Sequence, residues 1–170
     1  LRRSINMIFV TVGTHTQQFN RLLQKIDELI GNNKIKEKII AQIGNSTYKP
    51  VNYDYFKFSS EKKILEINKK AKLIISHAGI GNIITALQFK KPIIVIPRLK
   101  KFGEHINDHQ IQIAKAFAKE KKVLACYNLE YLEKIIQKAK KFKPKLIKRN
   151  PKIYEIIKQF LMIQNKKMSF

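Results

Sequence analysis

The sequence predicts an α/β domain in which helices cover both faces of a parallel sheet, in a Rossmann-like arrangement. Short apolar runs rich in β-branched residues alternate with stretches whose apolar residues recur at helical spacing. The chain has 170 residues, long enough for one substantial core and too short for two ordinary domains. No internal repeat divides it. One parallel sheet around one core is therefore the expected architecture.

The first strand and the first helix set the pattern. Residues 7–12 are an apolar, β-rich run ending at Gly13, as expected for a strand buried on both faces. Apolar residues then recur at helical spacing from Phe19 to Ile30, and Gly31 is a suitable helix stop. The further predicted strands are 39–43, 53–58, 73–76, 93–96 and 123–126, and the further predicted helices are 60–70, 82–89, 108–119, 129–140 and one after Pro151.

This pattern divides the chain into three segments. Residues 7–142 are expected to form the folded domain. Residues 1–6 precede the first strand and are expected to lie upstream of the natural start or to be added residues. In residues 143–170, Pro144 and Pro151 bracket a basic linker, and the helix predicted after it is expected to pack on the domain.

Composition narrows the function without naming it. Thirty-five Lys and Arg against twelve Asp and Glu give a net charge of +23, which attracts nucleic acid, anionic lipid or phosphorylated substrates. Part of this excess is Lys alternating with Ile, a compositional bias that also occurs across AT-rich genomes and thermophiles. This part of the charge therefore says little about the binding partner. Cys126 is the only cysteine, which excludes an internal disulfide and a cysteine-based zinc site. Without a secretory signal or an apolar run of about 18 residues, a cytoplasmic protein is expected.

Two strand-to-helix turns have the composition of an anion-binding site. Gly13 and Thr14 follow the first strand, and residues 76–82, Ser-His-Ala-Gly-Ile-Gly-Asn, join the fourth strand to a helix. Backbone N–H groups and the helix dipole at such turns suit a phosphate, and Gly79 and Gly81 allow it to approach closely. A tight turn alone also explains Gly13. A dinucleotide site is not favoured, because no third Gly has the required spacing and no acidic residue ends the second strand.

A third polar segment is 103–110, Gly-Glu-His-Ile-Asn-Asp-His-Gln, which follows the strand before Pro97. Polar side chains at the carboxyl ends of parallel strands are where such folds bind ligands. Asn107 or Asp108 is alternatively a helix cap, a role that binding does not exclude. The three histidines of these turns do not suggest zinc, because a helix and a loop separate His77 from the other two, and no metal site is expected.

Three motifs in order resemble the C-terminal domain of the family 28 glycosyltransferases, one half of the two-domain GT-B fold. They are residues 76–82, residues 91–97 (Lys-Pro-Ile-Ile-Val-Ile-Pro) and the pair His109-Gln110. The chain resembles in particular the small subunits of two-chain exopolysaccharide glycosyltransferases, through Val-Thr-Val-Gly-Thr at 10–14, Thr-Ala-Leu at 85–87 and residues 103–110. It is also similar to the donor subunit of the dolichol-linked GlcNAc transferase. The likeness covers about residues 7–125.

The resemblance implies a donor site built from these motifs. It implies that residues of the first two turns surround the diphosphate of a UDP-sugar: Gly13, Thr14, His77, Gly79, Gly81 and Asn82. It implies that the third segment contacts or flanks the donor hexose or its phosphate: Glu104, His105, Asn107, Asp108, His109 and Gln110. Many family members hold the ribose with a Glu where this chain has Thr85, so ribose recognition is expected to differ.

The function implied is that of the donor-binding subunit of a two-chain hexosyltransferase, which transfers a hexose from a UDP-sugar to a lipid-linked saccharide in polysaccharide or glycan synthesis. No cofactor is expected, because helix N-termini and backbone donors can stabilise the leaving diphosphate. A membrane-associated, acceptor-binding partner is expected to supply the general base and to recruit the chain to the inner face of the membrane, with His15 as the local candidate base. Residues 140–149 are the candidate contact with anionic lipid, and a solvated linker is the favoured alternative for this segment.

Two other functions stay open. The chain is alternatively a noncatalytic nucleotide-binding subunit that regulates its partner. It is alternatively a nucleic-acid-binding module, since a charge of +23 suffices for salt-dependent binding to phosphate backbones. No recognised nucleic-acid motif accompanies the charge, so nucleic acid is the less favoured partner.

Overall fold

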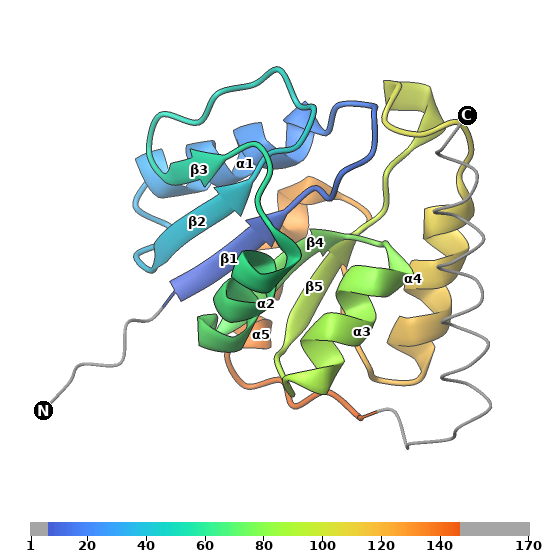
Figure 1. Ribbon diagram of the computed structural model, residues 1–170. Helices are drawn as coiled ribbons and strands as arrows, with labels where there is room; N and C mark the ends of the chain where they lie inside the picture. Colours follow the sequence, from blue (N-terminus) through green and yellow to red (C-terminus); the bar gives the residue numbers. More distant parts are fainter. Residues whose placement is uncertain (1–6, 147–170) are drawn as a thin grey trace, which may run out of the picture.

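Six parallel strands form one sheet in the order β3-β2-β1-β4-β5-β6 (Figure 1). The computed structural model describes residues 7–146. The strands are β1 (Met7–Thr11), β2 (Lys38–Gln42), β3 (Asp54–Phe56), β4 (Leu73–His77), β5 (Ile93–Ile96) and β6 (Leu124–Ala125). Because β1 pairs with both β2 and β4, the strand order reverses at β1, the place where doubly wound sheets bind ligands.

Helices cover both faces of the sheet, as the sequence predicts. On one face lie α1 (Asn20–Gly31) and α5 (Leu132–Ala139), and on the other α2 (Glu61–Lys70), α3 (Ile80–Gln88) and α4 (His109–Lys119) (Figure 1). Each face of the sheet packs on its helices through its own hydrophobic core. Successive residues of a strand point to opposite cores, so Val10 packs toward α1 and Phe9 packs toward α2 and α3. This two-sided burial explains why the strands are apolar runs without polar alternation.

The predicted elements between residues 7 and 140 are all present, and their ends shift by a few residues. The helix predicted at 129–140 begins as a 3-10 turn, Leu129–Tyr131, and a second 3-10 turn, Lys100–Phe102, was not predicted. The third predicted helix starts at Ile80 instead of Asn82, because Gly79 is its N-cap. The helix predicted after Pro151 lies outside the described residues. Within residues 7–146, no helix is long and apolar enough to cross a bilayer.

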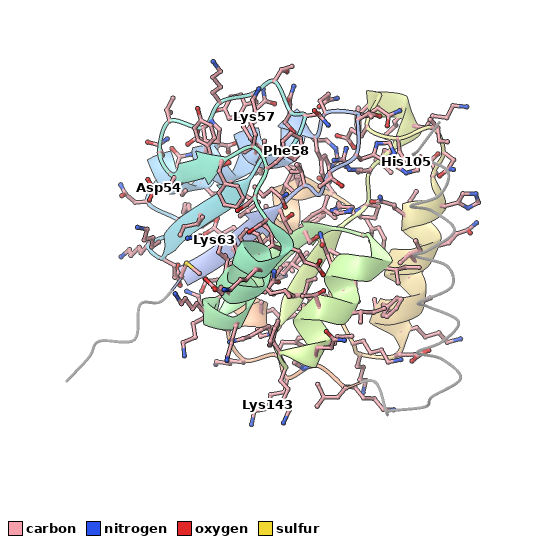
Figure 2. All side chains as sticks on the ribbon, in the orientation of Figure 1. Asp54, Lys57, Phe58, Lys63, His105 and Lys143 are labelled. Carbon is pink, nitrogen blue, oxygen red and sulfur yellow. The ribbon has the colours of Figure 1, made fainter. Side chains whose placement is uncertain are left out.

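The two edges of the sheet differ in charge. We call the edge where the strands end the carboxyl edge and the opposite edge, where they begin, the amino edge. The helix-to-strand connections and the segment after α5 lie at the amino edge and carry Lys34, Lys36, Lys72, Lys90, Lys91, Lys121, Lys122, Lys140, Lys141, Lys143 and Lys145. At the carboxyl edge, the connections that follow β1, β4 and β6 contain no Lys or Arg, and those that follow β2, β3 and β5 carry Lys49, Lys57, Arg98, Lys100 and Lys101. His105 and Lys143 mark the opposite edges in Figure 2.

Candidate functional site

Three connections meet beside the reversal of strand order at the carboxyl edge. They are residues 12–19 after β1, residues 78–79 after β4 and residues 97–108 after β5. His77 is the last residue of β4, and the other residues proposed from the sequence as donor contacts lie on these connections or in the helices that begin there. The fold therefore gathers at one edge the segments that are dispersed in the sequence.

The imidazole of His77 fills the space between the first two turns. A Cβ atom added at Gly13 would lie 2.5 Å from Cε1 of His77, and one added at Gly79 would lie 2.3 Å from Nε2. Gly13 also has φ of +73°, which disfavours any other residue. Glycines in these turns are expected from the sequence to let a phosphate approach the backbone. In the structure, glycine is required at positions 13 and 79 because a Cβ atom at either position would clash with the ring of His77.

His77 is held as a neutral side chain. Its Nδ1 lies 3.4 Å from Nδ2 of Asn82, which also donates a 2.9 Å hydrogen bond to Oγ of the buried Ser76. Burial, followed by the charge of Arg98, lowers the pKa of His77 to about 3. At neutral pH His77 is therefore uncharged, so it can form hydrogen bonds but cannot act as a cation.

The first turn of α3 presents open backbone donors. Gly79 is the N-cap and its side-chain position offers no hydrogen bond, so the early N–H groups of Ile80, Gly81 and Asn82 depend on an external acceptor. The positive end of the helix dipole is at the same place. Thr85 donates its hydroxyl to the carbonyl of Gly81 at 2.9 Å, so this side chain is engaged within the helix. The turn is suited to hold a phosphate.

Arg98 is a site residue that the sequence argument did not identify. Its side chain is fully buried, and its two terminal nitrogens donate to the carbonyls of Val12, Gln17, Gln18 and Glu104 at 2.6–3.0 Å. It thereby ties the connection after β1 to the connection after β5. Burial lowers its pKa to about 10, which leaves it charged at neutral pH. An arginine directly after a buried strand was the available signal, because arginine is rarely buried without partners.

Glu104 and Gln110 support the site from beneath. The buried carboxylate of Glu104 accepts from Nε of Arg21 at 2.6 Å and from the N–H of Leu99 at 2.9 Å. Oε1 of Gln110 accepts from the N–H groups of Ala78 and Arg98, both at 3.1 Å, which links the ends of β4 and β5. The resemblance implies that Gln110 contacts the donor hexose or its phosphate and that Glu104 flanks this segment. Their oxygens are occupied by protein donors, so both residues also hold the connections in place, and their contact with the donor stays a prediction.

The last residues of this connection, near the start of α4, differ in role: some form hydrogen bonds to the backbone and others are exposed to solvent. Oδ1 of Asn107 accepts from the N–H of His109 at 3.1 Å, so Asn107 caps the start of α4. Asp108 is the formal N-cap but its carboxylate turns back to the N–H of Lys100 at 2.8 Å. Thr14 and His109 are exposed at the same edge. Capping thus accounts for Asn107, and Thr14 and His109 stay accessible to a ligand.

His15 and His105 stack on each other across two of the connections. Their ring centroids lie 4.7 Å apart with an angle of 30° between the planes. Burial lowers the pKa of both rings, and the charge of Arg98 adds to the effect. Each half-buried ring therefore stays neutral at neutral pH.

In the part of the chain that the structure describes, this edge carries neither a metal-ligand cluster nor one of the two best-defined grooves. Among residues 7–146, no group of three or more His, Cys, Asp or Glu side chains is arranged to hold a metal ion. Two surface grooves lie elsewhere: one of about 530 Å³ is lined by α2 and Phe89, and one of about 440 Å³ by α1 and residues 48–52. The candidate site is an open face formed by loops and the start of α3.

Comparison with known proteins assigns a family to this architecture. The model of the glycosyltransferase family 28 C-terminal domain matches residues 7–163. The human UDP-N-acetylglucosamine transferase subunit ALG13 is 34% identical over 135 residues, which cover 70% of this chain and 11% of the human protein. The chain thus spans only a small part of that relative.

Two solved structures share the fold. The glycotransferase of kitacinnamycin matches with a TM-score of 0.63 and 16% identity, over 83% of this chain and 36% of that one. An NMR structure of ALG13 matches with a TM-score of 0.59 and 22% identity, over 90% of this chain and 95% of that one.

Proposed function

This chain belongs to the glycosyltransferase family 28 C-terminal domain family, and from that premise we propose that it is the donor-binding subunit of a two-chain glycosyltransferase. It binds a UDP-sugar at the carboxyl edge, and a partner chain contributes the acceptor site. The relative ALG13 is itself named as a subunit of a UDP-N-acetylglucosamine transferase, which supports both a UDP-sugar donor and a partner. The reaction is the transfer of a hexose to a saccharide acceptor in polysaccharide or glycan synthesis.

The observation that carries this proposal is the open first turn of α3 beside the ring of His77. The N–H groups of Ile80, Gly81 and Asn82 and the helix dipole favour the charge that develops on the diphosphate as the glycosidic bond breaks. Arg98, buried beneath, adds a positive field without touching the ligand. These groups stabilise the leaving group of a nucleotide-sugar donor.

Two features of the carboxyl edge support a partner chain: its exposed apolar side chains and the protonation of His15. Phe58, Phe102 and Ile106 expose large apolar side chains on the connections at the carboxyl edge, as a surface that a second chain covers would do. Nδ1 of His15 accepts from the N–H of Gln17 at 3.3 Å, so the neutral ring carries its proton on Nε2 and presents a donor. A base must accept a proton. We therefore assign the base to the partner.

We propose a cytoplasmic location, a lipid-linked saccharide acceptor and recruitment to the membrane by the partner. The carboxyl edge faces the partner in this arrangement, and the amino edge points away from it. The exposed lysines of the amino edge add a salt-sensitive attraction to anionic surfaces, including lipid headgroups. Residues 147–149 of the suspected basic segment lie outside the described residues.

The test is a calorimetric titration of the purified chain with UDP and a panel of UDP-sugars. Gly81→Asp adds a negative charge in the first turn of α3, where it favours the helix and repels a diphosphate. Gln88→Asp adds the same charge at the exposed far end of that helix. We expect the wild-type chain to bind UDP saturably. The affinity for UDP should fall at least about tenfold in Gly81→Asp and stay unchanged in Gln88→Asp.

The outcomes separate the competing functions. Equal weakening by both aspartates contradicts the assigned site. Absence of UDP binding, with and without a candidate partner, contradicts the donor-subunit proposal and favours a function of the basic amino edge, such as nucleic-acid binding. UDP binding without transfer in the assembled complex favours a regulatory subunit.

A further inference from the structure

The stacked pair of His15 and His105 has the same hydrogen-bonding pattern in both rings. Nδ1 of His15 accepts from the N–H of Gln17, and Nδ1 of His105 accepts from the N–H of Asn107, each at 3.3 Å. In each case the donor lies two residues further along the chain. A neutral imidazole whose Nδ1 accepts carries its proton on Nε2. Both rings therefore have Nε2–H as their free polar group.

The surroundings disfavour a positive charge on either ring. The charged or titratable groups that act on them are Arg98, His77, His109 and the partner ring. For His105, burial and the charge of Arg98 outweigh the hydrogen bonds with Asn107, which favour the charged form, so the pKa is lowered. The nearby carboxylates are already bound, Glu104 to Arg21 and the N–H of Leu99, and Asp108 to the N–H of Lys100. Protonation would also break the bond at Nδ1. No free carboxylate among these residues is available to hold an imidazolium.

We propose that His15 and His105 form a pair of neutral Nε2–H donors for phosphoryl oxygens of the donor nucleotide. This inference rests on the proposed function and specifies how the same site recognises its ligand. The two rings come from the connections after β1 and β5, which Arg98 joins, so their spacing is fixed before the ligand arrives. Neutral donors bind a diphosphate through hydrogen bonds, and nucleotide binding then takes up no proton.

Replacing His15 or His105 by Gln or by Asn tests whether Nε2–H of each ring is the group that binds the nucleotide. A Gln amide nitrogen reaches the position of Nε2, whereas an Asn side chain reaches only that of Nδ1. At both positions we expect His→Gln to retain UDP affinity within about threefold and His→Asn to lose about tenfold, because a hydrogen bond to a charged group is lost. Thermal unfolding of each variant at pH 7.5 shows whether the fold is kept. Equal affinities of the Gln and Asn variants would overturn the proposal.

The protonation state is measured directly in the wild-type chain. Calorimetry with UDP at pH 7.5, in two buffers of different ionisation enthalpy, is expected to show no proton uptake. Nitrogen NMR of the imidazoles is expected to show the Nε2–H form of His15 and His105 before and after UDP is added. UDP binding with uptake of about one proton, or an imidazolium in the complex, overturns this inference and leaves the proposed function intact. Failure to bind UDP at all contradicts the proposed function itself.

Discussion

The two edges of the sheet use charge in opposite ways. At the amino edge, lysines lie exposed on nearly every connection, and the ion pairs there, such as Lys34 with Glu133 and Lys140 with Glu37, are at the surface. At the candidate site, the important charges are Arg98 and Glu104, which are buried. The terminal nitrogens of Arg98 donate to four backbone carbonyls while its Nε has no partner, and Glu104 pairs with Arg21. Exposed pairs contribute little, whereas buried charges hold a structure only when paired. The net charge of the chain therefore does not identify its site.

The edges also differ in backbone conformation. Positive φ angles occur at Gly13, Gly44 and Gly103 after strands on the carboxyl edge, but at Asn33, Lys90 and Lys121 after helices on the amino edge. Glycine makes such a conformation easy, and a lysine there is strained. A ring or another backbone approaches two of these glycines, His77 at Gly13 and the carbonyl of Gly13 at Gly44, whereas Gly103 has open space around it. The carboxyl edge is thus the region in which close approach constrains the residue type.

The largest expected effect is that of Arg98→Met. The change leaves the carbonyls of Val12, Gln17, Gln18 and Glu104 without their donor, and we expect a loss of about 3–5 kcal/mol in the free energy of unfolding. The matched change at the amino edge, Lys72→Met, removes an exposed charge and is expected to cost less than about 0.5 kcal/mol. Urea unfolding measures both. A similar small loss for the two variants would show that Arg98 does not organise the site.

The next effect is a loss of stability in acid caused by His77. Its pKa is about 3 in the folded protein and near 6.5 when unfolded, so between these values the unfolded state binds more protons. Its contribution is complete above the unfolded pKa and is lost as the pH falls through this window. We expect about 2–3 kcal/mol less stability at pH 4 than at pH 7 from this group. Urea unfolding of His77→Gln should show a flatter pH dependence, and an unchanged slope would contradict this assignment.

Removing lysines of the amino edge is expected to have the smallest effect on UDP binding, although it should weaken binding to anionic membranes. We expect Lys72→Gln, Lys141→Gln and Lys143→Gln together to weaken binding to vesicles that contain anionic lipid, by about 1 kcal/mol per lysine at low salt. The UDP affinity should change by less than about twofold at 0.15 M salt, where such distant charges are screened. Vesicle co-sedimentation and calorimetry measure the two affinities. A large loss of UDP affinity would remove the distinction between the edges.

The sequence predicted the sheet and its helices because apolar periodicity directly reflects burial on one or two faces. It also located the turns at 13–14, 76–82 and 103–110, since Gly and polar residues after a strand are a local signal. It did not predict the stack of His15 on His105, the pairing of Arg21 with Glu104 or the role of Arg98. These contacts join segments far apart in the chain, and no local pattern contains them. The hydrogen bonds that Glu104 and Gln110 make to the protein were likewise not predicted, and the ligand contacts that the resemblance implies for them stay predictions.

The account is tested most directly by following backbone amide signals of the isotope-labelled chain by NMR during a titration with UDP. We expect shifts at residues 13–15, 79–82 and 103–109, on the carboxyl edge. Amides of the amino-edge connections, such as those of Lys72 and Lys90, should not shift. Shifts concentrated at the lysines of the amino edge, or no saturable shift at 79–82, would contradict the claim that this chain binds its nucleotide at the start of α3.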